Sequence, residues 1–244
     1  RDPLAIEGNR KLRLVSLEPI EPQPPLDADS ARRLGRLILD EIGIHDLAGR
    51  DLAGADLAGA DLSGADLTGT MLDAANLEGA KLAGVKAHRT AFTGANLKGA
   101  DFHGAELIDA PPAAARMNGA PFAKARIERP HLMLATLDDV DLEGTTLVRW
   151  TVANQSFAGV SFNGAHLSEC TFMRCIFDRA RFKKAHLFKT SFLEGSAVGV
   201  RFKGAHLLKV GFIKLPLDDA IFDKATIRES GFIGEPSMQH ASFF

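Results

Sequence analysis

Three histidines recur at intervals of 20 residues, at His166, His186 and His206. Imidazole is a good ligand for transition metals, so a fold that brought the three side chains together could hold a metal ion. No carboxylate occupies the corresponding place beside them, however, and repetitive folds align like residues in columns. We therefore expect an exposed column of histidines, with no bound metal and no cofactor.

Catalytic residues are not evident elsewhere in the chain. The spacing assembles no set of nucleophile, base and orienting residue. The 23 glycines form no phosphate-binding loop, because they follow a five-residue period. The sequence therefore predicts a protein that is not an enzyme.

A five-residue repeat positions all of these residues, and it is clearest in Asp51–Leu67, which reads DLAGADLAGADLSGADL. The large residue of each repeat, here called the centre, recurs at every fifth position from Leu47 to Phe232. Of these 38 centres, 35 are Leu, Phe, Ile, Val or Met, and the exceptions are Ala87, Pro112 and Ala197. A small residue usually lies two positions before each centre. A period of five fits neither a helix face nor a flat strand.

A fixed short period is typical of a solenoid. With one large and one small inward residue in five, each repeat can form one side of a narrow coil. The pattern stands here as ADLAG, ADLSG, ANLEG and ANLKG, and it resembles the pentapeptide-repeat family, whose motif is A(D/N)LXX. The resemblance covers residues 46–233 and implies an all-β fold, a right-handed quadrilateral β-helix. With four repeats per coil, the 38 repeats would make about nine and a half coils stacked roughly 4.8 Å apart.

The chain divides into four segments. Residues 1–29 are expected to form an extended Pro-rich linker or strap, and residues 30–45 a helix that caps the open end of the solenoid. Residues 46–233 are the β-helix and residues 234–244 a tail that ends in two phenylalanines. Because the chain lacks an initiator Met, we expect it to be a fragment or a processed product.

The bulk composition narrows the class of protein further. The net charge is −2, and the sequence has no signal peptide and no run of eighteen apolar residues that could span a membrane. We expect a cytoplasmic bacterial protein. The two cysteines, Cys170 and Cys175, both occupy the small inward position, so buried reduced thiols are expected rather than a disulfide scaffold.

Charge is distributed unevenly along the array. Residues 40–120 hold 12 acidic and 6 basic residues, and an acidic belt could mimic DNA phosphate; the alternative, which we favour, is that Asp is simply the consensus residue before each centre. Residues 121–244 hold 16 basic and 13 acidic residues. The candidate basic patch of one coil comprises Arg174, Arg179, Arg181, Lys183, Lys184 and Lys189.

The frame is least regular in residues 111–155. Pro112, Leu132 and Val152 are stacked centres, and Pro130 and Trp150 take the small position before two of them. Neither suits a corner built for Ala, so this side is expected to bulge in three successive coils. Trp150 either turns outward as a binding anchor or is held inside a widened corner.

One outward column in the C-terminal half is unusually apolar. Such a stripe on a protein surface marks an interface, unless the N-terminal strap or the C-terminal tail covers it. With Trp150, the candidate interface comprises Met173, Leu193, Ile213 and Ile233 on one side of the coil and Phe188 and Leu208 on the neighbouring side.

These features favour a protein-interaction scaffold or adaptor that binds a protein partner or itself. Arrays of this style behind a short helix also resemble the C-terminal modules of bacterial type VI secretion accessory proteins. The alternative is a DNA-mimicking modulator of DNA gyrase or topoisomerase, like the fluoroquinolone-resistance pentapeptide proteins. Nucleic-acid binding through the basic residues is a third hypothesis, which we consider unlikely because few aromatic residues accompany them.

Overall fold

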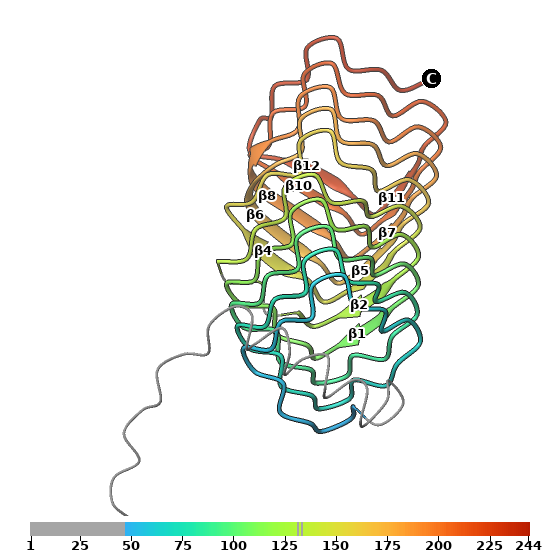
Figure 1. Ribbon diagram of the computed structural model, residues 1–244. Helices are drawn as coiled ribbons and strands as arrows, with labels where there is room; N and C mark the ends of the chain where they lie inside the picture. Colours follow the sequence, from blue (N-terminus) through green and yellow to red (C-terminus); the bar gives the residue numbers. More distant parts are fainter. Residues whose placement is uncertain (1–46, 131, 133) are drawn as a thin grey trace, which may run out of the picture.

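The chain repeats its path in space every 20 residues. A computed structural model describes residues 47–130, 132 and 134–244 and arranges them as a rod of stacked rectangular coils (Figure 1). Parallel pairing joins residues that lie 20 positions apart, from Asp51↔Met71 near the start to Arg201↔Ile221 near the end. Leu47 and Ile227 lie 180 residues apart and so are separated by nine turns of this path. The expected all-β quadrilateral β-helix is confirmed, whereas the expected linker (1–29) and capping helix (30–45) lie outside the described residues.

Each coil has four walls. In the coil of residues 166–185, the first wall is 166–170, the second 171–175, the third 176–180 and the fourth 181–185. On the first wall a seven-stranded parallel sheet has the order β1 (Glu106–Ile108), β2 (Arg126–Glu128), β3 (Thr146–Val148), β5 (His166–Ser168), β7 (His186–Phe188), β9 (His206–Leu208) and β11 (Thr226–Arg228). On the second wall a five-stranded parallel sheet has the order β12 (Gly231–Ile233), β10 (Gly211–Ile213), β8 (Ser191–Ser196), β6 (Thr171–Ile176) and β4 (Thr151–Ala153).

The core is the column of centres along the rod axis. Nearly every described centre from Leu47 to Phe222 is buried, and the small residues beside them are buried too. In the C-terminal half most of the centres are phenylalanines, and their rings stack coil upon coil. The rings of Phe162 and Phe182 lie 4.5 Å apart and those of Phe182 and Phe202 4.8 Å apart. Cys170 and Cys175 are both buried and free, as expected.

The turn within each repeat explains why glycine follows the five-residue period. The second residue after each centre adopts a positive φ, for example 67° at Gly84. Glycine reaches this left-handed region without the steric cost that a Cβ atom imposes. In the C-terminal half the same slot often holds a charged residue, such as Lys184 with a φ of 57°, so that half carries more of this backbone strain than the N-terminal half, where the slot is mostly glycine.

Candidate interaction surfaces

Among the predicted interface residues, Trp150 differs most clearly from its expected exposure. Its side chain is only 2% exposed, so it does not serve as an exposed anchor; the widened-corner alternative is the one the structure adopts. The indole adjoins a small cavity of ≈ 20 Å³ that is also lined by Ile127, Leu132 and Leu142 of the coils below. Its Nε1–H has no hydrogen-bond partner within the described residues. An unpaired buried donor costs roughly 1–3 kcal/mol, so Trp150 fills the corner imperfectly.

Backbone pairing is interrupted directly below Trp150 on two of the four walls. One coil higher, the Thr171 N–H donates to the Trp150 carbonyl at 2.6 Å, and the Phe157 N–H donates to the Ile176 carbonyl at 2.7 Å. The same register assigns the Thr151 N–H to the Pro130 carbonyl and the Leu137 N–H to the Ser156 carbonyl. Neither bond forms between these described residues. We call this break, between residues 130–139 and residues 151–158, the seam.

The other two walls run through this level intact. On the first wall the Arg129 N–H donates to the Val148 carbonyl at 3.0 Å, and on the fourth wall the Leu142 N–H donates to the Ser161 carbonyl at 3.1 Å. The seam is therefore an opening on the second and third walls only. The sequence interpretation placed a bulge in three successive coils on this side. Among the described residues of the second wall, the Phe92 N–H still donates to the Pro111 carbonyl and β4 still pairs with β6, so the interruption lies between residues 111 and 151.

A cleft of ≈ 840 Å³ opens at the seam on the second wall. Its apolar lining includes Pro130, Leu132 and Val152, and its polar lining includes Asn154 and Gln155. Leu134, at its rim, is 82% exposed. Sequence reasoning missed Leu134, and the only signal was its place between two residues, Pro130 and Gln155, that both break the frame.

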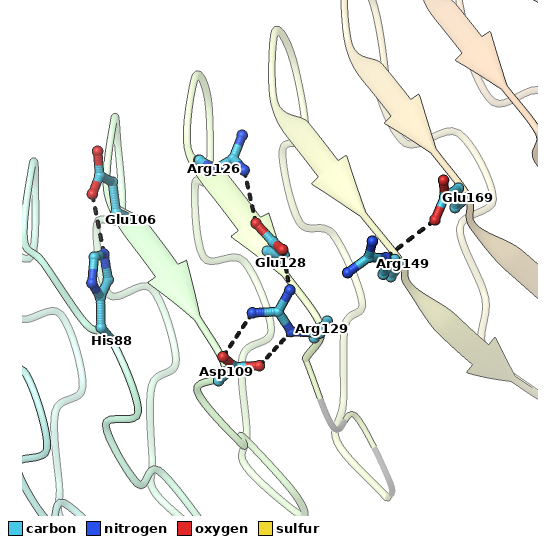
Figure 2. Close-up of polar contacts among 8 residues, drawn as sticks. All are labelled: His88, Glu106, Asp109, Arg126, Glu128, Arg129, Arg149 and Glu169. Carbon is cyan, nitrogen blue, oxygen red and sulfur yellow. Dashed lines mark hydrogen bonds and ion pairs between the residues drawn. The ribbon is translucent and has the colours of Figure 1, made fainter.

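Ion pairs border the cleft on the side of the first wall (Figure 2). Arg129 donates to both carboxylate oxygens of Asp109, at 2.6 and 2.8 Å, and also bonds to Glu128. Arg149 donates to Glu169 at 3.1 Å. Each arginine therefore has a carboxylate partner in an adjoining coil. Arg129 pairs with the coil below it and Arg149 with the coil above it, so the ion pairs flank the seam and do not cross it.

The predicted apolar stripe is present on the C-terminal half. Met173 and Ile233 on the second wall are 37% and 56% exposed, and Phe188 and Leu208 on the first wall are 37% and 36% exposed. Leu193 and Ile213 complete the stripe as half-buried residues. Lys189 Nζ lies 5.2 Å from the centre of the Phe188 ring, which puts a cation over part of the stripe. No described segment covers Phe188 or Ile233.

The predicted basic patch is not a patch. Its six residues lie on all four walls of the coil, because a step of five residues turns the chain to the next wall. Arg174 lies on the second wall, Arg179 on the third and Lys189 on the first. Only Arg181, Lys183 and Lys184 share the fourth wall. There the backbone of Arg181 forms a parallel β-bridge with that of Arg201 in the next coil.

The three histidines stack on the first wall, with ring centres 4.7 Å apart between His166 and His186 and 4.7 Å apart between His186 and His206. Burial and the two neighbouring imidazoles lower the pKa of His186. Within the described residues no group of three or more His, Cys, Asp or Glu could hold a metal ion. All three histidine side chains are exposed, as the sequence predicts.

The aspartates of the N-terminal repeats hold their own turns. The carboxylates of Asp51, Asp61 and Asp66 each accept a hydrogen bond from the backbone N–H two residues ahead, at 3.1, 3.2 and 2.9 Å. Hydrogen bonds from Ser63 and Thr68 lower the pKa of Asp61 and Asp66. This bonding is the local turn chemistry for which Asp is favoured, so it supports a structural role for the consensus residue.

Burial makes the two cysteines poor nucleophiles. It raises the pKa of Cys170 to about 11 and also raises that of Cys175. Because the thiolate is the reactive form, neither thiol is suited to catalysis near neutral pH. In residues 47–244, apart from 131 and 133, no helix is long and apolar enough to cross a membrane.

Comparison with known proteins agrees with the geometry. The family model described as pentapeptide repeats matches eight copies, within residues 51–86, 75–110 and 156–192. No curated protein sequence matches the chain.

Solved structures of pentapeptide-repeat proteins are similar in part. HetL of the cyanobacterium Nostoc sp. strain PCC 7120, involved in heterocyst differentiation regulation, is 20% identical over 84% of this chain and 94% of its own, with a TM-score of 0.48. A thylakoid-lumen protein of Arabidopsis thaliana is 28% identical over 41% of this chain and 66% of its own, with a TM-score of 0.33. QnrB1, a plasmid-mediated fluoroquinolone resistance protein, is 13% identical over 78% of this chain and 91% of its own, with a TM-score of 0.26. The matched residues are pentapeptide repeats, and the 20-residue coil continues their path through the described part of the chain.

Proposed function

We propose that the protein is a non-enzymatic scaffold that binds a protein partner through the apolar stripe of its C-terminal half. The observation that carries this proposal is the exposure of large apolar side chains in outward slots. Met173, Phe188, Leu208 and Ile233 are each more than a third exposed. Exposed apolar side chains are unfavourable in water, and covering them with a partner's surface is favourable.

The scaffold suits this role because it fixes where each side chain points. Met173, Leu193 and Ile213 stand in register on three successive strands of one parallel sheet, so their spacing is the strand spacing of roughly 4.8 Å. Little side-chain and backbone entropy remains to be lost when a partner docks on such a surface. Aromatic and aliphatic residues that are held rigidly are the residues that dominate binding energy at interfaces.

The test is a pair of matched double variants. Leu193→Asp with Ile213→Asp places charges in the middle of the stripe, and Lys183→Asp with Lys203→Asp changes the same slot of the repeat on the fourth wall. Both double variants should keep the melting temperature within a few degrees. Affinity capture from the native host and sedimentation should show that only the first loses its partner or its self-association. Equal capture and equal mass for both would sink the proposal.

A more specific hypothesis is that the partner belongs to a bacterial secretion system in the cytoplasm. The same capture experiment decides this, because a component of a type VI secretion system should be enriched with the wild-type chain and lost with the stripe variant. If the enriched protein has another role, the scaffold proposal stands and the secretion hypothesis falls.

The gyrase-modulator alternative has less support from the geometry. Asp51, Asp61 and Asp66 direct their carboxylates to their own backbone, so their presence has a structural cause that needs no DNA mimicry. A supercoiling assay with purified gyrase is the direct check. Inhibition or protection at micromolar protein would restore this alternative, and its absence would remove it.

A further inference from the structure

We propose that the lower edge of β4 is a second binding site, which takes an extended, uncharged peptide segment of a partner protein as an added strand. β4 is the end strand of the five-stranded sheet, and its free edge faces the cleft at the seam. This site adjoins the apolar stripe but is a different feature, because it is formed by backbone groups rather than by outward side chains.

The two edges of β4 differ in their bonds to the described residues. Toward the coil above, the Asn154 N–H donates to the Met173 carbonyl at 2.9 Å. Toward the coil below, the N–H groups of Thr151 and Ala153 have no bond to the carbonyls of Pro130 and Leu132, the described residues that the register would assign to them. Unpaired strand edges are the surfaces to which extended peptides add by β-augmentation.

The spacing of these donors favours a peptide over other ligands. Two N–H groups that point the same way on a strand lie two residues apart, about 6.8 Å. A second extended backbone repeats its carbonyls at the same interval and can meet both donors at once. The cleft volume of ≈ 840 Å³ is large enough for a segment of several residues.

The side chains around the edge define the chemistry of that segment. Val152 and Leu132 line the cleft together with Pro130, so an apolar side chain of the peptide would be covered where it points toward the rod. Asn154 and Gln155 provide amide groups at the far end of β4. These can bond to polar side chains that alternate with the apolar one.

The charges at the cleft argue against a charged partner. Arg129 is bonded to Asp109 and Glu128, and Arg149 is bonded to Glu169 (Figure 2). The cations that border the cleft are therefore compensated within the rod. A polyanion such as nucleic acid would have to break these pairs to bind here, whereas an uncharged strand leaves them in place.

The experiment uses a strand of this protein's own second wall as a probe. The peptide Lys-Thr-Ser-Phe-Leu-Glu-Gly-Ser-Ala, residues 189–197, carries no net side-chain charge and has the pattern of that wall. Labelled with fluorescein at its N-terminus, it is titrated with the full chain up to 1 mM and binding is followed by anisotropy. The same peptide with N-methyl groups on its Phe and Glu amides keeps the side chains but loses two backbone donors.

Two variants at one position separate the backbone from the side chain. Thr151→Pro removes the unpaired N–H, and Pro111 shows that the same slot of the second wall accepts proline. Thr151→Val removes the hydroxyl but keeps the N–H. Circular dichroism melting confirms that each variant is folded, and any variant that is not is replaced by Ala153→Pro.

The expected result is saturable binding to the wild type and to Thr151→Val, and at least about tenfold weaker binding to Thr151→Pro and of the N-methylated peptide, as for loss of a backbone hydrogen bond. The stripe variant Leu193→Asp with Ile213→Asp should bind the peptide as the wild type does, so the two proposals fail independently. No saturable binding to the wild type, or equal binding to Thr151→Pro, overturns the inference.

Discussion

The rod below the seam and the rod above it fill the same coil in different ways. Below it, the centres are mostly Leu, the left-handed slot is mostly Gly, and Asp side chains hold the turns. Above it, stacked Phe rings fill the axis, and charged residues often accept the left-handed slot. The lower half places fewer residues with a Cβ atom in the left-handed region than the upper half does. The difference shows that the same backbone coil can be filled by two different sets of side chains, which we call the two side-chain solutions.

The seam lies where these two solutions meet. Trp150 is the largest residue that the small inward position holds anywhere in the repeat array, and it lies at the first coil of the upper half. Its ring reaches toward the Leu-centred coils below. On the second and third walls the described residues do not pair at this level, and the two halves of the rod are connected by the backbone bonds of the first and fourth walls.

The largest expected effect comes from the centres. Phe182 and Leu82 occupy the same wall and slot, five coils apart, and both are 0% exposed. Phe182→Ala should cost about 3–5 kcal/mol and Leu82→Ala about 2–5 kcal/mol, with Phe182 at the higher end because its ring stacks on two others. Urea unfolding of both variants measures the difference. A smaller loss for Phe182→Ala would show that the aromatic column does not stabilise the upper half.

The left-handed slot should give effects of opposite sign in the two halves. Gly84→Lys in the lower half should destabilise the rod by roughly 1 kcal/mol, because a Cβ atom is strained at its φ of 67°. Lys184→Gly, at the same slot and wall of the upper half, should relieve strain and raise the melting temperature or leave it unchanged. Thermal melts of the two reciprocal variants check the signs. A marked destabilisation by Lys184→Gly would mean that the lysine side chain contributes more than its backbone costs.

The turn-holding role of Asp predicts a smaller asymmetry. Asp61 accepts bonds from the Ser63 backbone N–H, the Ser63 hydroxyl at 2.7 Å and Lys81, whereas Arg181 has no described side-chain bond in the same slot. Asp61→Ala should therefore lower the stability of the rod, because it removes the acceptor of these bonds, and Arg181→Ala should be nearly neutral. Equal losses in denaturant unfolding would remove the structural explanation of the consensus aspartate.

The smallest expected effect is a difference in pH dependence. The pKa of His186 is lowered from 6.5 in the fold, so the unfolded chain binds its proton first and stability falls as pH drops below about 6.5. The pKa of Asp61 is lowered from 3.8, so its contribution is present above that value and is lost as pH falls further. Melting curves from pH 7.5 to 3 should show the first step disappear in His186→Gln while the second remains. An unchanged first step would assign it to another group.

The coil could be predicted from the sequence because every fifth residue, such as Leu57 or Phe162, is buried along the rod axis and must be large and apolar. The sequence also placed the apolar stripe, since the outward slot follows from the same register. Arg174 and Lys189 were predicted to belong to one basic patch, but they lie on different walls. The prediction took closeness in the sequence as closeness on the surface. The seam was foreseen only as a bulge near Pro130 and Trp150, because backbone pairing between coils depends on how a buried indole is accommodated, and composition does not fix that.

Native-state amide hydrogen exchange tests the seam most directly. Thr151 and Leu137 should exchange through small local fluctuations, because their N–H groups bond to no described residue across the seam. Thr171 and Phe157, which hold the corresponding bonds one coil higher at 2.6 and 2.7 Å, should exchange only on larger opening. Protection of Thr151 and Leu137 equal to that of Thr171 and Phe157 would contradict the seam, and with it the division of the rod into two halves.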